Sequence, residues 1–134
     1  MIAGRRDTEQ IIVAEESGHI RGYAHCGPSR NPGAPPSTAE LYSFYVAPSH
    51  WRRGFGRRLL VESLRELARM TFDDVTLWVL ATNRSARAFY ERFGWTADGS
   101  EKASHPSMTE VRYQTAVARW AYADVDEQAD RLFR

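Results

Sequence analysis

The chain has 134 residues, a length that suits one domain with a single hydrophobic core. Hydrophobic residues make up 43% and charged residues 26% of the sequence, a globular balance that excludes a disordered or fibrous protein. The formal net charge is +1, from 18 basic and 17 acidic residues, which argues against a surface built mainly for nucleic acid.

Cysteine usage and hydropathy indicate the compartment. Cys26 is the only cysteine, so no intrachain disulfide can form and a reducing, cytoplasmic location is expected. Residues 1–10 lack the apolar stretch of a signal peptide, and no apolar run approaches the length of a membrane span. We therefore expect no membrane partner.

The first part of the chain predicts strands. Residues 11–15 and 20–26 are rich in β-formers and are joined by a short turn containing Gly18, which predicts a hairpin. Residues 27–39 hold four of the six prolines and predict a loop. Residues 40–47 again favour a strand, which ends where a proline follows.

The next stretch has the features of a phosphate-binding site. Gly54 and Gly56 stand one residue apart, directly before a helical pattern whose apolar face includes Leu60 and Leu64. The first turn of a helix leaves backbone N–H groups without partners and carries the positive end of the macrodipole, so it favours an anion. Glycine has no Cβ and lets a ligand approach the backbone closely. Four cationic residues surround the two glycines, namely Arg52, Arg53, Arg57 and Arg58.

Two other glycine-rich loops fit this stretch poorly. A P-loop has a lysine and a serine or threonine after its second glycine, where this chain has Arg57 and Arg58. A dinucleotide fingerprint needs a third small residue where Leu59 stands. Taken alone, the segment is also compatible with a plain strand-to-helix turn whose arginines are solvated.

A second strand-helix unit follows the first. Residues 75–80 form an apolar run of strand length, and the order strand, helix, strand implies a right-handed crossover between parallel neighbours. Asn83 suits a helix N-cap, and Gly94 suits the end of that helix. The apolar face of this short helix is mostly aromatic, with Ala86, Phe89, Tyr90 and Phe93.

The remaining chain is expected to complete the sheet. Residues 95–98 and 108–118 predict strands, and the polar residues 99–107 between them predict a loop. The tail from Trp120 could form a helix with an apolar side, made by Val125, Ala129 and Leu132.

These segments together resemble the GNAT superfamily of acetyl-CoA-dependent N-acetyltransferases. The family's acyl-CoA loop, Gln/Arg-x-x-Gly-x-Gly/Ala, matches residues 51–56, and its later motif, Asn-x-x-Ala-x-x-Phe-Tyr-x-x-x-Gly-Phe, matches residues 83–95. The strand just before the loop is a third shared feature. The resemblance implies an α+β fold with a mixed central sheet flanked by helices. It also implies one N-acetyltransferase domain over residues 1–134, with a core of about 11–118 and a carboxyl-terminal tail at 119–134.

The resemblance also implies a mechanism. In this family the acetyl group passes directly from acetyl-CoA to an amine in a ternary complex, with no metal and no nucleophile from the enzyme. Tyr90 is implied as the general acid that protonates the departing thiolate, although spacing alone equally allows a core aromatic. The backbone N–H of Val46 is implied to polarise the thioester carbonyl. The residues implied to bind the cofactor are Tyr45, Val46, Arg52, Arg53, Gly54, Phe55, Gly56, Arg57, Asn83 and Tyr90.

The general base is a separate question. Glu40 can deprotonate an ammonium directly or through water, and family members often use an acid on this strand. An exposed carboxylate at a strand end is the alternative for Glu40. His50 and His105 are further candidates, each also compatible with a solvated surface position.

Two departures from the family pattern bear on function. Trp51 stands where the family has Gln or Arg, so the backbone donors are expected to carry the pyrophosphate contact. About ten residues precede the first strand, where family domains usually have a strand and helices that help form the acceptor groove. We therefore expect another element to bury that sheet face, either the tail or a second copy, and we favour a homodimer.

The expected partner is a small-molecule or peptide amine, and its identity stays open. A non-catalytic acyl-CoA-binding module is the alternative function. Nucleic-acid binding through the arginine cluster is a more distant third, because the net charge is nearly neutral.

Overall fold

The computed structural model describes residues 8–121. Its strands are β1 (Gln10–Glu16), β2 (His19–Pro28), β3 (Thr38–Val46), β4 (Asp74–Leu80), β5 (Thr96–His105) and β6 (Met108–Ala116). Its helices are the 3₁₀ turn η1 (Pro48–His50) and the α-helices α2 (Phe55–Arg69), α3 (Arg84–Arg92) and α4 (Ala118–Ala121). This mixed sheet with flanking helices confirms the predicted fold class.

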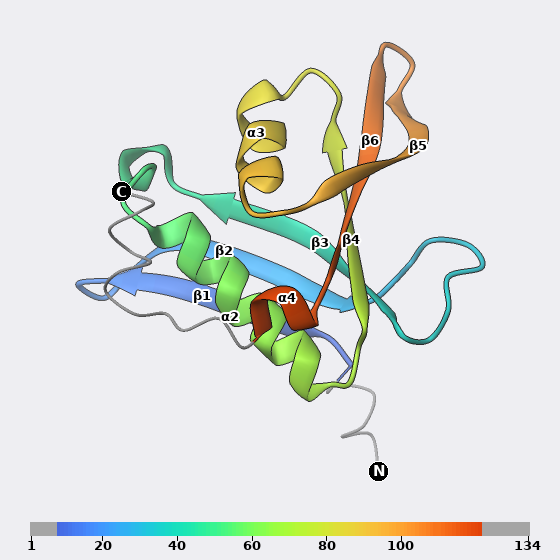
Figure 1. Cartoon of the computed structure of the whole chain (residues 1–134). Helices are drawn as coiled ribbons and strands as arrows, with labels where there is room; N and C mark the ends of the chain where they lie inside the picture. The colour runs from blue at the N-terminus through green and yellow to red at the C-terminus, as the bar shows by residue number, and fades with distance from the viewer. Residues whose placement is uncertain (1–7, 122–134) are drawn as a thin grey trace.

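The strands form one sheet in the order β1-β2-β3-β4-β6-β5 (Figure 1). The β3–β4 pair is parallel and the four other described pairs are antiparallel, so the predicted parallel pairing of the strands that α2 connects is confirmed. The register of β3 and β4 contains only three pairs, from Thr38–Asp74 to Glu40–Thr76. Beyond Glu40 the two strands diverge, as Figure 1 shows, and this divergence positions the site described below.

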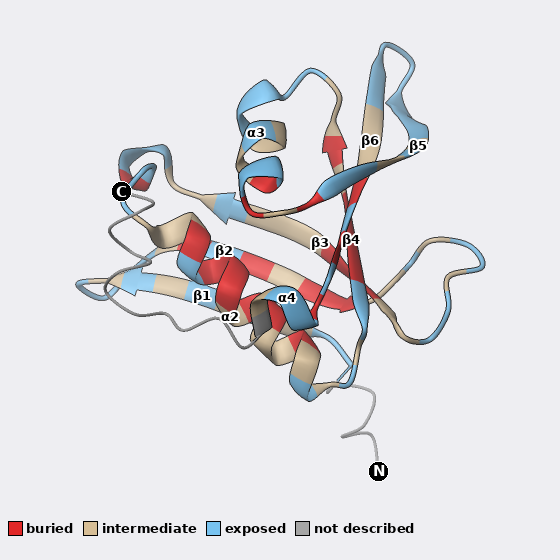
Figure 2. Cartoon of the chain, in the orientation of Figure 1, coloured by how far each residue is buried: buried red, intermediate tan, exposed pale blue. Residues whose placement is uncertain are grey.

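Helix α2 covers one face of β1–β3. Leu60, Leu64 and Leu67 are at most 2% exposed and share a core with the small residues Ala24 and Cys26 of β2 (Figure 2). Burying one leucine side chain stabilises the fold by about 1.5–3 kcal/mol. The contact is close because β2 offers small side chains at these positions.

The opposite face of β1–β3 carries exposed apolar side chains. Ala24 pairs with Phe44 and faces the core, whereas the adjacent pair Tyr23–Tyr45 points to the other side. Tyr45 is 49% exposed, and Ile11 is 68% exposed. This arrangement agrees with the expected uncovered face. The predicted tail helix lies outside the described residues, and the homodimer stays a prediction.

The predicted loop over residues 99–107 is wrong. β5 continues to His105 and forms a hairpin with β6, so only Pro106 and Ser107 lie between the strands. Its residues are polar because this edge strand is mostly exposed to solvent (Figure 2). His105 therefore lies at an exposed hairpin end. Within residues 8–121, no helix is long and apolar enough to span a membrane.

Candidate active site

A cavity of about 400 Å³ opens where β3 and β4 diverge. We call it the inter-strand cavity. Its walls come from β2, β3, β4, α3 and β6, and they include Tyr23, Tyr42, Phe44, Tyr45, Trp78, Asn83, Ala86, Tyr90 and Glu110. The strand register shows that the lining side chains lie on two faces of the sheet. Phe44 lies on the side of α2 and α3, where its ring is near Phe89 and Tyr90, and Tyr45 lies on the opposite side. The cavity is therefore lined by side chains from both faces of the sheet.

Tyr90 forms the α3 wall of this cavity. Its side chain is 8% exposed, and its ring packs against Phe44 and Trp95 with centroid distances of 6.2 and 5.7 Å. Burial raises the pKa of Tyr90 to about 12. The phenol is thus protonated at neutral pH and can donate a proton to a strong base. The alternatives of a core aromatic and a site residue do not exclude each other for Tyr90, because the ring belongs to the core and the residue also lines the cavity.

Asn83 starts α3 as predicted. Its Oδ1 accepts a hydrogen bond from the backbone N–H of Ala86 at 3.1 Å, which confirms the N-cap. Asn83 also lines the inter-strand cavity beside Tyr90. One residue therefore fixes the start of α3 and contributes to the wall.

The end of β3 directs backbone groups towards the cavity side. The N–H of Ala47 donates to the carbonyl of Arg21 at 2.7 Å, and backbone groups of successive strand residues point to opposite edges. The N–H of Val46 consequently points away from β2, towards the side where β4 has diverged. The Val46 carbonyl points the same way and accepts from the indole Nε1–H of Trp51 at 2.7 Å. Trp51 thus ties the loop to the end of β3.

The predicted phosphate-binding segment, residues 52–58, is called the cradle below. Its two glycines have different roles. Gly54 is the N-cap of α2 with φ +85°, a left-handed conformation that favours glycine. A Cβ on Gly56 would lie 3.3 Å from the ring of Phe89, so glycine lets α2 begin close to α3. The first backbone bond of the helix runs from Arg58 to Gly54, and the N–H groups of Phe55 and Gly56 precede it. This geometry suits an anion.

The arginines of the cradle are not equivalent. Arg57 is 4% exposed and belongs to the buried side of α2, whereas Arg58 is exposed. Arg53 donates to the carboxylate of Glu16 at 2.9 Å. Only part of the positive charge expected around the glycines therefore faces solvent.

Glu16 is a residue that sequence reasoning missed. Its carboxylate lies 3.0 Å from Nε2 of His50 and also pairs with Arg53, so the end of β1 holds both flanks of the loop. The hydrogen bond with His50 is the main cause that lowers the pKa of Glu16. His50 is 6% exposed and does not line the inter-strand cavity, which argues against its use as a base there.

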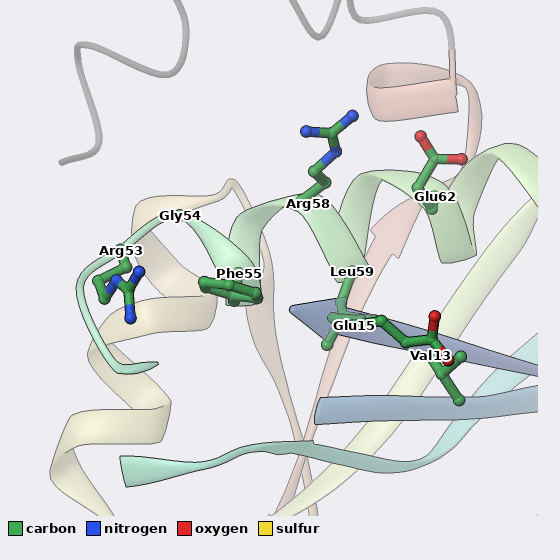
Figure 3. A pocket seen from close by; sticks show the side chains of 9 residues that line it. Val13, Glu15, Arg53, Gly54, Phe55, Arg58, Leu59 and Glu62 are labelled. Atoms are coloured by element: carbon green, nitrogen blue, oxygen red, sulfur yellow. The ribbon is translucent and has the colours of Figure 1, made fainter. Parts of the chain in front are cut away.

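A second hollow, of about 460 Å³, lies between β1 and the start of α2. Figure 3 shows Arg58 and Glu62 extending away from the sheet and Leu59 lying between α2 and β1. Gly54 and Phe55 also line this hollow. It leaves the start of α2 accessible from the side of β1.

The structure does not bring Glu40 to the inter-strand cavity. Glu40 is 8% exposed, its Oε1 accepts from the backbone N–H of Arg30 at 2.8 Å, and it is not among the lining residues. The acid in the lining is Glu110 of β6. Sequence analysis overlooked Glu110 because its position depends on pairing with Leu80, a partner thirty residues earlier in the chain.

The comparison with known families identifies the protein family. The profile of the acetyltransferase (GNAT) family matches residues 3–95. The chain belongs to this family. Two curated relatives are a probable N-acetyltransferase of Mycobacterium tuberculosis, 33% identical over 95 residues, and a mycothiol acetyltransferase of Acidimicrobium ferrooxidans, 30% identical over 92 residues. The alignments cover 71% and 69% of this chain, and 51% and 29% of those proteins. This GNAT chain therefore spans about half of the length of the first relative and less than a third of the second.

A solved structure supports the GNAT fold independently. The ribosomal-protein-alanine N-acetyltransferase of Brucella melitensis superposes with a TM-score of 0.71 at 27% identity, and the match covers 84% of this chain and 71% of that one. This chain and that relative therefore share one overall fold.

Proposed function

We propose that this GNAT chain transfers the acetyl group of acetyl-CoA to a primary amine by direct attack in a ternary complex. The observation that carries the proposal is the inter-strand cavity, which has Tyr90 in one wall and is lined by side chains from both faces of the sheet. A thioester and an amine can meet in such a cavity from opposite sides. The acetyltransferase names of the relatives support the same reaction class.

Acetyl-CoA fits the elements on the α2 side. The N–H groups at the start of α2, approached past Gly54, suit the pyrophosphate. The N–H of Val46 suits the thioester oxygen, whose negative charge grows as the amine attacks. Asn83 is proposed to contact the arm of the cofactor from α3, whereas the side chain of Tyr45, a predicted cofactor contact, points to the opposite face of the sheet.

The chemical step follows from these assignments. The amine nitrogen attacks the thioester carbon, a C–N bond forms, and the C–S bond breaks. Tyr90 gives its phenolic proton to the departing thiolate, and solvent restores that proton. The ammonium loses one proton to a base before the neutral amine attacks, and the nitrogen loses a second proton as the C–S bond breaks. That second proton offsets the one that Tyr90 gives to the thiolate, so charge and atoms balance over the cycle.

A two-part experiment tests the proposal. Titration with CoA measures binding, and incubation of acetyl-CoA with a panel of primary amines measures release of free CoA and formation of the N-acetyl product. We expect both binding and transfer. Binding without transfer to any amine would favour the acyl-CoA-binding module, and absence of binding would contradict the cradle itself.

A further inference from the structure

We propose that Glu110 receives the ammonium group of the acceptor, accepts its proton, and selects amines that carry no carboxylate beside the nitrogen. The inference rests on the proposed acetyl transfer and assigns the base and the acceptor class of the same site. Its starting observation is the charge of the inter-strand cavity. Glu110 is the single residue with a charged side chain in the lining that the structure describes.

Glu110 lies on the face of the sheet opposite Tyr90. It pairs with Leu80 at the end of β4, next to the Val79–Val111 pair. Tyr113 lies two residues after Val111 on β6 and therefore on the same face, and its hydroxyl accepts a hydrogen bond from Arg87 of α3 at 3.0 Å. Because successive strand residues alternate between faces, Glu110 points away from α3. The carboxylate and the phenol of Tyr90 thus flank the cavity from opposite sides, as proton removal from the amine and proton donation to the thiolate require.

Lys102 of β5 accompanies Glu110 at the cavity rim. Its Nζ lies 3.7 Å from Glu110 Oε2 and 4.4 Å from the ring centroid of Trp78. Its side chain is 48% exposed, so the pair is screened by solvent and is weak. An incoming ammonium can therefore replace Lys102 at the carboxylate without leaving a buried lysine.

Aromatic walls on this face favour a cation. Tyr23, Tyr45 and Trp78 line the cavity on the side of Glu110, and the faces of such rings attract ammonium groups while accepting an apolar body. The combination of one carboxylate and several rings suits an amine attached to an apolar or aromatic group.

The same walls disfavour a free amino acid. Within residues 8–121, no arginine, lysine or histidine is among the cavity's lining residues, and Lys102 stays at the solvent-exposed rim. A carboxylate held inside the cavity beside the amine would therefore be desolvated with no cationic partner there. The nearby Arg112 is engaged, since its Nε donates to Asp98 Oδ2 at 2.5 Å. The acceptor class is therefore a primary amine whose neighbouring carbonyl, where it has one, is an amide, as in a peptide amino terminus.

The proton balance of the assigned step is simple. The acceptor enters as an ammonium, Glu110 takes one proton, and the neutral nitrogen attacks the thioester. As the C–S bond breaks, the nitrogen loses a second proton to water, which offsets the proton that Tyr90 gives to the thiolate. Glu110 returns the proton to water after the N-acetyl product leaves. No oxidant, reductant or further reactant is required.

Tyrosinamide and tyrosine are matched probes for this proposal. They differ in an amide against a carboxylate, and because the carboxylate also raises the pKa of the amine, the rates are compared per concentration of neutral amine. With the wild-type chain we expect kcat/KM at least about tenfold higher for tyrosinamide, because an unpaired buried polar group costs at least about this factor. Glu110→Gln should lower kcat/KM for tyrosinamide by about 100-fold or more, the lower end of general acid–base effects, and should leave CoA affinity and Tm unchanged. Glu101→Gln on neighbouring β5, an exposed acid outside the lining, should stay within about twofold of wild type. Glu110→Asp should recover part of the rate.

Each outcome decides a separate point. Equal kcat/KM for the two probes, or a preference for tyrosine, would overturn the acceptor class. Full activity of Glu110→Gln would overturn the role of Glu110, and a loss in Glu40→Gln instead would return the base to Glu40. A failure of the wild-type chain to acetylate any amine would overturn the proposed function, and this inference with it.

Discussion

Replacing Tyr90 with phenylalanine removes one hydroxyl from a buried ring. The ring keeps its contacts with Phe44, Trp95 and Tyr113, so the free energy of unfolding should change by no more than about 1 kcal/mol. General acid catalysis is worth about 100-fold to 10,000-fold, which corresponds to about 2.7–5.4 kcal/mol of transition-state stabilisation. We expect kcat to fall by this factor while CoA affinity stays nearly constant, because the thiolate exists only as the bond breaks.

The pH profile gives the same test a second readout. Because burial raises the pKa of Tyr90 to about 12, the phenol keeps its proton well above the pH at which an ordinary tyrosine ionises, about 10. Steady-state kcat of the wild-type chain should therefore show no alkaline decline from this group up to about pH 10. A decrease of kcat in Tyr90→Phe smaller than about threefold would refute the assignment of Tyr90 as the acid.

Three other changes test the cradle and its supports. Gly54→Val forces a branched residue to φ +85° at a cost of at least about 1–2 kcal/mol, so isothermal titration should show a larger loss of CoA affinity than Arg58→Ala, and equal losses would count against the backbone cradle. Glu16→Gln should lower Tm at neutral pH, where the carboxylate is charged. The folded-state pKa of Glu16 is lowered, so its contribution to stability is present above the ordinary carboxyl pKa and is lost as pH falls through the lowered value. The Tm difference between Glu16→Gln and wild type should therefore shrink in acid. A Tm difference that grows in acid would be inconsistent with this role. Asn83→Ala should cost about 1 kcal/mol in denaturant unfolding through the lost cap, with Asn83→Asp as the conservative control, and equal stability of the two variants would argue against the cap.

Local signals explain what could be predicted from the sequence. The N-cap at Asn83, the helix after Gly56 and the crossover between β3 and β4 follow from spacing within short segments, and the structure confirms them. Gly54 adopts φ +85°, a conformation that glycine takes at little cost.

Non-local strand pairing explains which features could not be predicted from the sequence. The acid in the cavity is Glu110, and its place depends on the antiparallel pairing of β4 and β6, which no local pattern specifies. Glu16 reaches His50 across thirty-four residues for the same reason. Residues 99–107, most of which belong to β5, are predicted as a loop because an exposed edge strand lacks the apolar alternation that marks a half-buried one. Glu40 has suitable chemistry, but the backbone N–H of Arg30 holds its carboxylate.

The most direct test of acetyl transfer is a single reaction followed by mass spectrometry and thiol detection together. The chain is incubated with acetyl-CoA and tyrosinamide, and both the N-acetyl product and free CoA are quantified against a reaction without the amine. The account predicts equal amounts of the two products, formed only when chain and amine are both present. Tight CoA binding with no N-acetyl product from tyrosinamide or any other amine in the panel would contradict it.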